Sequence, residues 1–271
     1  MLEYFYITNS PDVAKACERA GIDRVFVDME YIGKDKRQGG LDTVQNHHTV
    51  DDVKNLRAVL KKSKLLVRVN PIHDGSEKEI NDVIDAGADI IMLPMWKTPA
   101  EVEAFIRMVD KRAKTLLLLE TDEARLCIDK VLELDGIDEV HIGLNDLHLC
   151  QHKSFMFELY TDGTVDEIVS KLKAKNIKFG IGGVGKVNYP NTLPAENVLC
   201  EHYRLGSSMA IIARAFCDWT KHSVEEFEKI MTDGIAENRE YEKKIMMNDK
   251  CFFDDMHEQT AKIIHQIVSK K

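Results

Sequence analysis

Short apolar runs alternate with amphipathic stretches along most of this chain. The four leucines at residues 116–119 are typical of a strand buried on both faces. Several amphipathic stretches start at a capping residue followed by proline, as in Ser10-Pro11 and Thr98-Pro99, which favours helices. We expect strands at residues 5–8, 24–28, 64–70, 89–94, 115–120, 139–143, 178–182 and 203–205. Eight strands alternating with helices predict a closed parallel sheet, the (β/α)8 TIM barrel of the α/β class.

The chain length suits one such barrel. At 271 residues and 44% hydrophobic content, with no linker rich in proline, glycine or serine, residues 1–271 are expected to form a single domain. Residues 220–271 continue beyond the barrel as a C-terminal helical extension with apolar stripes. These stripes fit either capping of the barrel bottom or packing against a neighbouring subunit.

Charge and cysteine content exclude several classes of protein. The 46 acidic and 37 basic residues give a net charge of −9, which disfavours binding to nucleic acid or to an anionic membrane surface. No apolar run approaches the ~20 residues of a membrane span, and the N-terminus does not resemble a secretory signal. The six scattered cysteines fit free thiols, so we expect a cytoplasmic protein.

Charged residues stand where several predicted strands end. Glu120 and Asp146 follow the fifth and sixth strands, and the carboxyl ends of barrel strands form the mouth where chemistry occurs. Two carboxylates there can hold Mg²⁺ or Mn²⁺ and leave positions for a chelating 2-oxo acid. Taken singly, each residue also fits a helix or turn cap. Arg68, inside an apolar strand, favours the functional interpretation because an inward-facing arginine needs an anionic partner.

The partner of Arg68 is left open by the sequence. It could pair with Glu120 or Glu30, or bind the carboxylate or enolate oxygen of a substrate. Asp28 and Glu30 lie two residues apart on one strand and so face the same side, where they could orient Arg68 or hold water.

Candidates for proton transfer follow the second strand. Tyr31, His47 and His48 flank or end a polar loop of ~17 residues, which is long for a connection within a barrel. Histidine has a suitable pKa for a general base, although His47 and His48 could equally be a solvated lead-in to a helix. A water held by Asp28 or Glu30 is the alternative base. The glycine-rich segment 180–186, which ends in Lys186, could cradle a phosphate or simply allow close backbone approach.

Five segments resemble the HpcH/HpaI aldolase/citrate lyase family, within the phosphoenolpyruvate/pyruvate barrel superfamily. They are Phe26-Val27-Asp28-Met29-Glu30, Leu66-Val67-Arg68-Val69-Asn70, Ala86-Gly87-Ala88-Asp89-Ile90-Ile91-Met92-Leu93-Pro94-Met95, Leu119-Glu120-Thr121 and Ile142-Gly143-Leu144-Asn145-Asp146-Leu147. The likeness extends from about residue 23 to 146 and weakens toward 216.

The resemblance implies a class II pyruvate aldolase or an acyl-CoA lyase. It implies that Glu120 and Asp146 bind the divalent metal and that Arg68 contacts the oxo-acid. Gly143 and Asn145 would lie in a loop whose backbone meets the substrate carboxylate. Barrels of this family associate through their C-terminal helices, so a homo-oligomer, either a trimer or a hexamer, is also implied.

The chain departs from the sugar-acid aldolases of the family at Tyr31, where they usually carry a base histidine. The loop that follows is longer, and residues 147–149 read Leu-His-Leu instead of a small, serine-rich continuation. The leading hypothesis is a metal-dependent carbon–carbon lyase that cleaves or forms a 4-hydroxy-2-oxo acid from pyruvate and an aldehyde. The alternatives are a lyase of another oxo-acid, phosphorylated or linked to coenzyme A, and a barrel that binds an oxo-acid without turnover.

Overall fold

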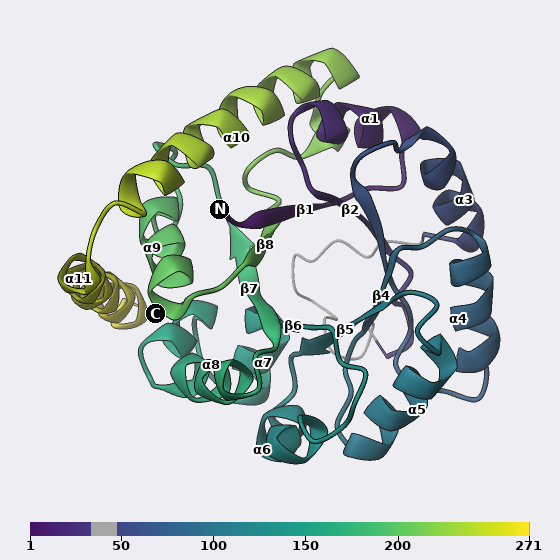
Figure 1. Ribbon diagram of the computed structural model, residues 1–271. Coiled ribbons are helices and arrows are strands. Elements are labelled where there is room, and N and C mark those ends of the chain that lie inside the picture. Colours follow the sequence, from purple (N-terminus) through teal and green to yellow (C-terminus); the bar gives the residue numbers. More distant parts are fainter. Residues whose placement is uncertain (34–47, 271) are drawn as a thin grey trace.

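Eight parallel strands close into a barrel in the computed structural model, which describes residues 1–33 and 48–270 (Figure 1). Each strand pairs with its neighbours in sequence, and β8 closes the ring against β1. The strands are β1 (Glu3–Ile7), β2 (Arg24–Asp28), β3 (Lys64–Arg68), β4 (Ile90–Leu93), β5 (Lys114–Leu119), β6 (Glu139–Ile142), β7 (Lys178–Val184) and β8 (Met209–Ile212). The predicted TIM-barrel fold is therefore confirmed.

Helices surround the barrel on its outer side (Figure 1). They are α1 (Pro11–Arg19), α3 (Val50–Val59), α4 (Ser76–Asp85), α5 (Pro99–Val109), α6 (Asp122–Val131), α7 (Leu144–Cys150), α8 (Thr164–Ala174), α9 (Ala195–Leu205), α10 (Val224–Ile245) and α11 (Lys250–Val268), with short 3-10 turns at Met156–Tyr160 (η1) and Trp219–Lys221 (η2). Thr49, Thr98 and Ser223 each close a capping box at the start of α3, α5 and α10. Within the described residues, no helix is long and apolar enough to cross a membrane.

One predicted strand is wrong. Residues 203–205 form the last turn of α9, and the eighth strand starts at Met209. Gly206, in the left-handed conformation, ends α9 and turns the chain into β8. A run of three β-prone residues is too short to reveal its period, and the buried face of α9 decides the conformation.

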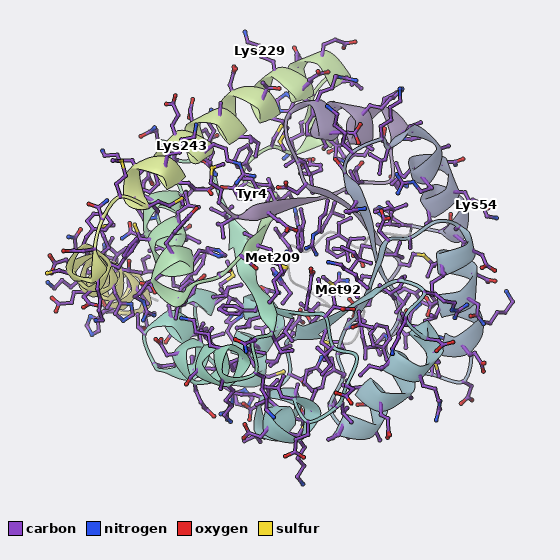
Figure 2. All side chains as sticks on the ribbon, in the orientation of Figure 1. Tyr4, Lys54, Met92, Met209, Lys229 and Lys243 are labelled. Carbon is purple, nitrogen blue, oxygen red and sulfur yellow. The ribbon has the colours of Figure 1, made fainter. Side chains whose placement is uncertain are left out.

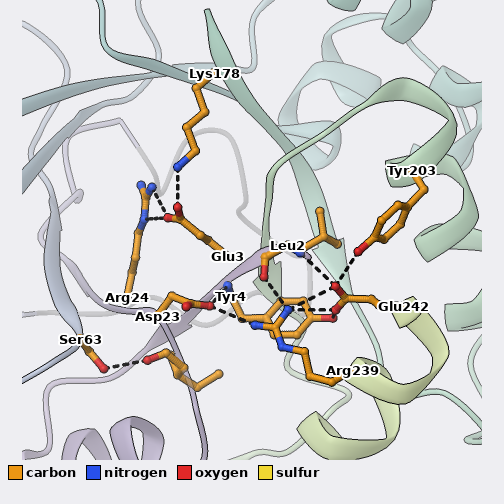
Figure 3. Close-up of polar contacts among 11 residues, drawn as sticks. Leu2, Glu3, Tyr4, Asp23, Arg24, Ser63, Lys178, Tyr203, Arg239 and Glu242 are labelled. Atoms are coloured by element: carbon orange, nitrogen blue, oxygen red, sulfur yellow. Dashed lines mark hydrogen bonds and ion pairs between the residues drawn. The ribbon is translucent and has the colours of Figure 1, made fainter. Parts of the chain in front are cut away.

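The inside of the barrel is packed with side chains that alternate with the outward-facing ones along each strand. This inner cluster comprises Phe5, Phe26, Leu66, Ile90, Met92, Leu116, Leu118 and Met209. Figure 2 shows Met92 and Met209 within the ring of strands, whereas Lys54, Lys229 and Lys243 lie at its periphery. At the N-terminal end, Arg24 and Lys178 both bind the carboxylate of Glu3 (Figure 3). Arg24 also binds the buried carboxylate of Glu139. This ionic layer closes the barrel on the side opposite the mouth.

Helix α10 is fastened to the first strand by the buried carboxylate of Glu242 (Figure 3). That carboxylate accepts hydrogen bonds from the amide of Leu2 at 3.0 Å, from the hydroxyl of Tyr203 at 2.7 Å and from the hydroxyl of Tyr4. Arg239 supplies the counter-charge at 3.0 Å and also reaches Asp23. The N-terminal strand, the end of α9 and α10 are therefore joined by one carboxylate.

Replacing Glu242 with alanine should lower the free energy of unfolding by about 3–5 kcal/mol, because Arg239 and two tyrosine hydroxyls lose their buried partner. The exposed Glu240 on the same helix is the matched control, and Glu240→Ala should change stability by less than about 0.5 kcal/mol. Urea unfolding of both variants measures the difference. Equal stabilities would show that α10 is held by its apolar contacts alone.

Helix α11 lies outside the ring of helices, against α9 (Figure 1). Two polar contacts hold it there: Asn197 donates to Thr260 at 2.9 Å in a buried contact, and the half-buried His257 lies 2.7 Å from Glu201. Only Thr260 and Ile264 of this helix are fully buried, while Phe252, Phe253, Met256, Ile263 and Ile267 remain half-buried. The extension thus packs on the side of the barrel and leaves much apolar surface accessible.

Candidate active site

Arg68 is held at the mouth by two carboxylates, one at the end of the adjacent strand β2 and one just after it. The register pairs Asp28 with Arg68, and the guanidinium donates to both Asp28 oxygens at 2.8 Å. Glu30 lies 3.2 Å from Nη1 of Arg68, so the fork is fixed on two sides. Burial acts to lower the pKa of Arg68, but the charges of Asp28 and Glu30 outweigh it and the pKa is raised. Arg68 is therefore a permanent, oriented cation, and its predicted pairing with Glu30 is present.

Glu120 follows β5 directly and is only 3% exposed. Its Oε1 accepts a hydrogen bond from the amide of Met95 at 3.1 Å, and Met95 adopts a left-handed conformation (φ 54°), uncommon for a residue other than glycine. Burial raises the pKa of Glu120 well above its usual value. The nearby Arg68 opposes this rise, whereas the charges of Asp146 and Glu30 add to it. Such a carboxylate is costly to ionise unless a cation binds beside it.

Asp146 is placed by a short helix and not by the end of a strand. Strand β6 ends at Ile142, and Asp146 stands in the first turn of α7, whose N-cap is Gly143. The amide of Gly143 donates to the carbonyl of Leu119 at 2.9 Å, which fixes the start of α7 beside Glu120. A Cβ on Gly143 would lie 2.8 Å from the Cβ of Glu120, so this approach requires glycine.

Glu120 and Asp146 thus form an acidic pair on one side of the mouth, and their charges interact. Within the described part of the chain, no group of three or more histidine, cysteine, aspartate or glutamate side chains is arranged to hold a metal. Two carboxylates nevertheless suit Mg²⁺ or Mn²⁺, which commonly retain several waters or substrate oxygens. A bound divalent cation would also offset the cost of ionising the buried carboxyl group of Glu120, whose pKa is raised. Asn145, the other predicted substrate contact, is exposed in the first turn of α7.

His48 lies at the carboxyl end of β2, beside Asp28. Its Nδ1 accepts a hydrogen bond from the backbone amide of Asp28 at 3.0 Å. In this arrangement the neutral ring carries its proton on Nε2, since Nδ1 uses its lone pair as acceptor. His47 lies outside the described residues.

Tyr31 is 62% exposed, and its amide and that of Ile32 donate to Oδ1 of Asn70, both at 3.0 Å. Asn70 is buried and donates in turn to Glu79 at 2.6 Å. It therefore fixes the turn that leaves the Asp28–Glu30 segment, a role that sequence reasoning missed. The only signal was a polar residue directly after an apolar strand.

The glycine-rich segment 180–186 forms most of β7 and the turn after it, and that turn is bound by α10. The side chain of Asn238 accepts from the amide of Val187 and donates to the carbonyl of Gly185, both at 3.0 Å. A Cβ on Gly185 would meet the side chain of Asn191 at 2.8 Å, and Lys186 lies 3.7 Å from Glu237. The amide of Val187 and the ammonium group of Lys186 thus already have partners, which favours close backbone approach as the reason for these glycines.

The HpcH/HpaI aldolase/citrate lyase family model matches residues 2–177, more than half of the sequence. The chain belongs to this family. The match includes Asp28, Arg68, Glu120 and Asp146, and the family unites aldolases and citrate lyases. The resemblance found in the sequence is thereby confirmed.

Solved structures share the fold at low sequence identity. An HpcH/HpaI aldolase from Desulfitobacterium hafniense DCB-2 has a TM-score of 0.63 at 14% identity, covering 87% of this chain and 92% of its own. A family protein from Burkholderia cenocepacia J2315 has a TM-score of 0.61 at 15% identity, with 78% and 87% covered. The citrate synthase SbnG has a TM-score of 0.58 at 16% identity, with 78% and 85% covered. No curated protein matches the sequence.

Proposed function

We propose that this protein is a metal-dependent carbon–carbon lyase that cleaves a 4-hydroxy-2-oxo acid to pyruvate and an aldehyde, or runs the reverse addition. The observation that supports it most is the opposition of a fixed cation, Arg68, and an acidic pair, Glu120 and Asp146, at the barrel mouth. Membership in a family of aldolases and citrate lyases supports the same reaction class.

Glu120 and Asp146 would hold Mg²⁺ or Mn²⁺. The chemistry that such an ion supplies is polarisation of the 2-oxo carbonyl, which lowers the cost of forming an enolate. Arg68 would stabilise the negative charge that develops on that oxygen. Asp28 and Glu30 keep its fork oriented, and because guanidinium has five N–H groups, it can serve both carboxylates and still reach the substrate.

The carboxylate of the oxo-acid would lie at the start of α7. Gly143 and Asn145 stand there, beside the acidic pair, and the positive end of the helix favours an anion. This orientation would leave the enolate carbon, which forms the bond to the aldehyde, on the open side of the mouth, toward the end of β2. The group that exchanges a proton with the 4-hydroxyl must therefore come from that direction.

His48 and His47 are the proposed proton-transfer groups, and a water oriented by Asp28 or Glu30 is the alternative. To accept the 4-hydroxyl proton, the His48 ring must release the amide of Asp28, because in the contact described above Nδ1 is engaged and Nε2 already carries a proton. If His48 is the group, His48→Ala should lower kcat about 10²-fold and remove an ionisation near pH 6–7 from the rate profile. His47→Ala is the parallel variant, and His73→Ala, on the loop after β3, is the control. If the His47 and His48 variants both keep the wild-type rate and profile, the water route is supported instead.

The direct test of the reaction is metal-dependent release of a proton from pyruvate, measured by exchange in deuterated water. An aldehyde panel then identifies the acceptor, and acyl-CoA esters test the citrate lyase-like alternative. Exchange without turnover of any acceptor would support an enolate-forming enzyme of a different specificity. Absence of both would favour a barrel that binds an oxo-acid without converting it.

We further propose that the protein is a homo-oligomer, a trimer or a hexamer, because α11 leaves Phe252, Phe253 and Met256 half-buried. A groove of about 720 Å³ between α11 and η1 adds apolar surface at Ala261 and Val268. Light scattering at low micromolar concentration should give about three or six times the 30.9 kDa of one chain. A particle of one chain's mass would contradict this.

A further inference from the structure

Strand β7 carries a bulge just below the mouth. Gly180 pairs with Met209 and Gly183 with Ile211, so three residues of β7 span the distance of two on β8. Gly182 takes a left-handed conformation (φ 45°) at this point. A bulge of this kind leaves backbone groups outside the ladder of hydrogen bonds. The carbonyl of Gly182 therefore needs a partner from elsewhere.

That partner is the side chain of His141, on the neighbouring strand β6. The ring is fully buried inside the barrel, 5.9 Å from the ring of Phe5, and its Nε2 lies 3.0 Å from the carbonyl oxygen of Gly182. Because a carbonyl can only accept, Nε2 carries the proton.

The ring fits this place because β7 has no side chain there. A Cβ on Gly180 would lie 2.5 Å from Nδ1 of His141, an atom that has no hydrogen-bond partner among the described residues. Burial, together with the charges of Arg24 and Arg68, lowers the pKa of His141 to about 4, so the ring is neutral. The neutral ring with this tautomer has one N–H group, and that group is directed at the carbonyl of Gly182.

The bulge in turn contacts the helix that carries Asp146. A Cβ on Gly182 would lie 2.9 Å from Cδ1 of Leu144, so the leucine packs directly on the bulge. Leu144 is the first residue of α7, between Gly143 and Asn145. A displacement of Gly182 would therefore shift Leu144 and the start of α7, which carries Asp146.

We propose that His141 is a positioning residue. Through its hydrogen bond to Gly182 it fixes the β7 bulge, and through Leu144 it places Asp146 beside Glu120. The proposal rests on the proposed function for its catalytic consequence. Its structural part, the dependence of α7 on His141, stands independently of the reaction.

The test compares His141→Met, which fills the space without an N–H group, with His141→Gln, which retains a donor. Thr260→Val is the control, because Thr260 is also a buried, hydrogen-bonded side chain but lies on α11 and bonds Asn197 of α9. Mn²⁺ titration should show about 10-fold weaker binding for His141→Met, in the range found for groups that orient metal ligands. His141→Gln should recover to within about 3-fold of wild type, and the control should match wild type.

A crystal structure of His141→Met is the second measurement and requires no activity. We expect the Gly182 carbonyl to turn and the start of α7 to shift with it. An unchanged bulge and α7, or wild-type Mn²⁺ affinity in His141→Met, would overturn the proposal. If wild-type protein binds no Mn²⁺, the metal part of the proposed function fails, and the crystal structure alone decides the role of His141.

Discussion

Replacing Glu120 with glutamine should reduce metal-dependent turnover by about 10³-fold or more while the barrel stays folded. The side chain retains its size and its contact with the amide of Met95 but loses one of two charges available to a divalent ion. Several kcal/mol of transition-state stabilisation would disappear with the ion, since a factor of ten in rate corresponds to about 1.4 kcal/mol. Asp146→Asn should behave similarly. Glu123→Gln, an exposed change on α6, is the control.

The same variant should be more stable than wild type when metal is removed. Glu120 has a folded-state pKa above the ordinary 4.5. Its contribution to the free energy of unfolding is therefore fully present below pH 4.5 and is lost as the pH rises through the folded-state pKa. In urea unfolding with a chelator, Glu120→Gln should exceed wild type at pH 8 and converge with it near pH 4. Lower stability of the variant at pH 8 would show that the buried carboxylate is favourably compensated by Arg68 alone.

Replacing Arg68 with lysine should lower kcat by about 10²-fold and raise KM much less. The guanidinium binds Asp28 through two N–H groups and Glu30 through a third, and an ammonium cannot make this fork. If Arg68 acts mainly on the developing enolate, its loss appears in kcat and in kcat/KM alike. Arg57→Lys is the control, because Arg57 pairs with Asp89 away from the mouth. An unchanged kcat with a raised KM would assign Arg68 to substrate binding alone.

Strand ends were the most predictable part of the molecule. A buried strand must be apolar, so a charged residue such as Arg68 or Glu120 at its carboxyl end stands out against it. Asp146 was expected at a strand end but lies on α7, a short helix whose place depends on the contact between Gly143 and Glu120. That contact joins residues 23 positions apart, and hydrophobic periodicity carries no information about it.

The missed features share the same cause. Residues 203–205 are the last turn of α9, not the predicted strand. The contacts of α9 with β7 and α10 favour the helix, and these contacts cannot be read from three residues of sequence. Asn70 and His141 act by hydrogen bonds to distant backbone groups, at Tyr31 in the turn after β2 and at Gly182 in β7. Polar residues with such partners look like ordinary strand positions in the sequence, so their roles emerged only from the fold.

The central claim is that Glu120, Asp146 and Arg68 together form a site that generates an enolate from a 2-oxo acid. The most direct measurement is proton NMR of pyruvate in deuterated water with the protein and Mg²⁺ or Mn²⁺. We expect the methyl signal to decay at a rate proportional to enzyme concentration and to stop decaying when a chelator is added. In Glu120→Gln the decay should be about 10³-fold slower, and in Arg68→Lys about 10²-fold slower. A methyl signal that persists with folded wild-type protein and either ion, or that decays equally in Glu120→Gln, would contradict the account.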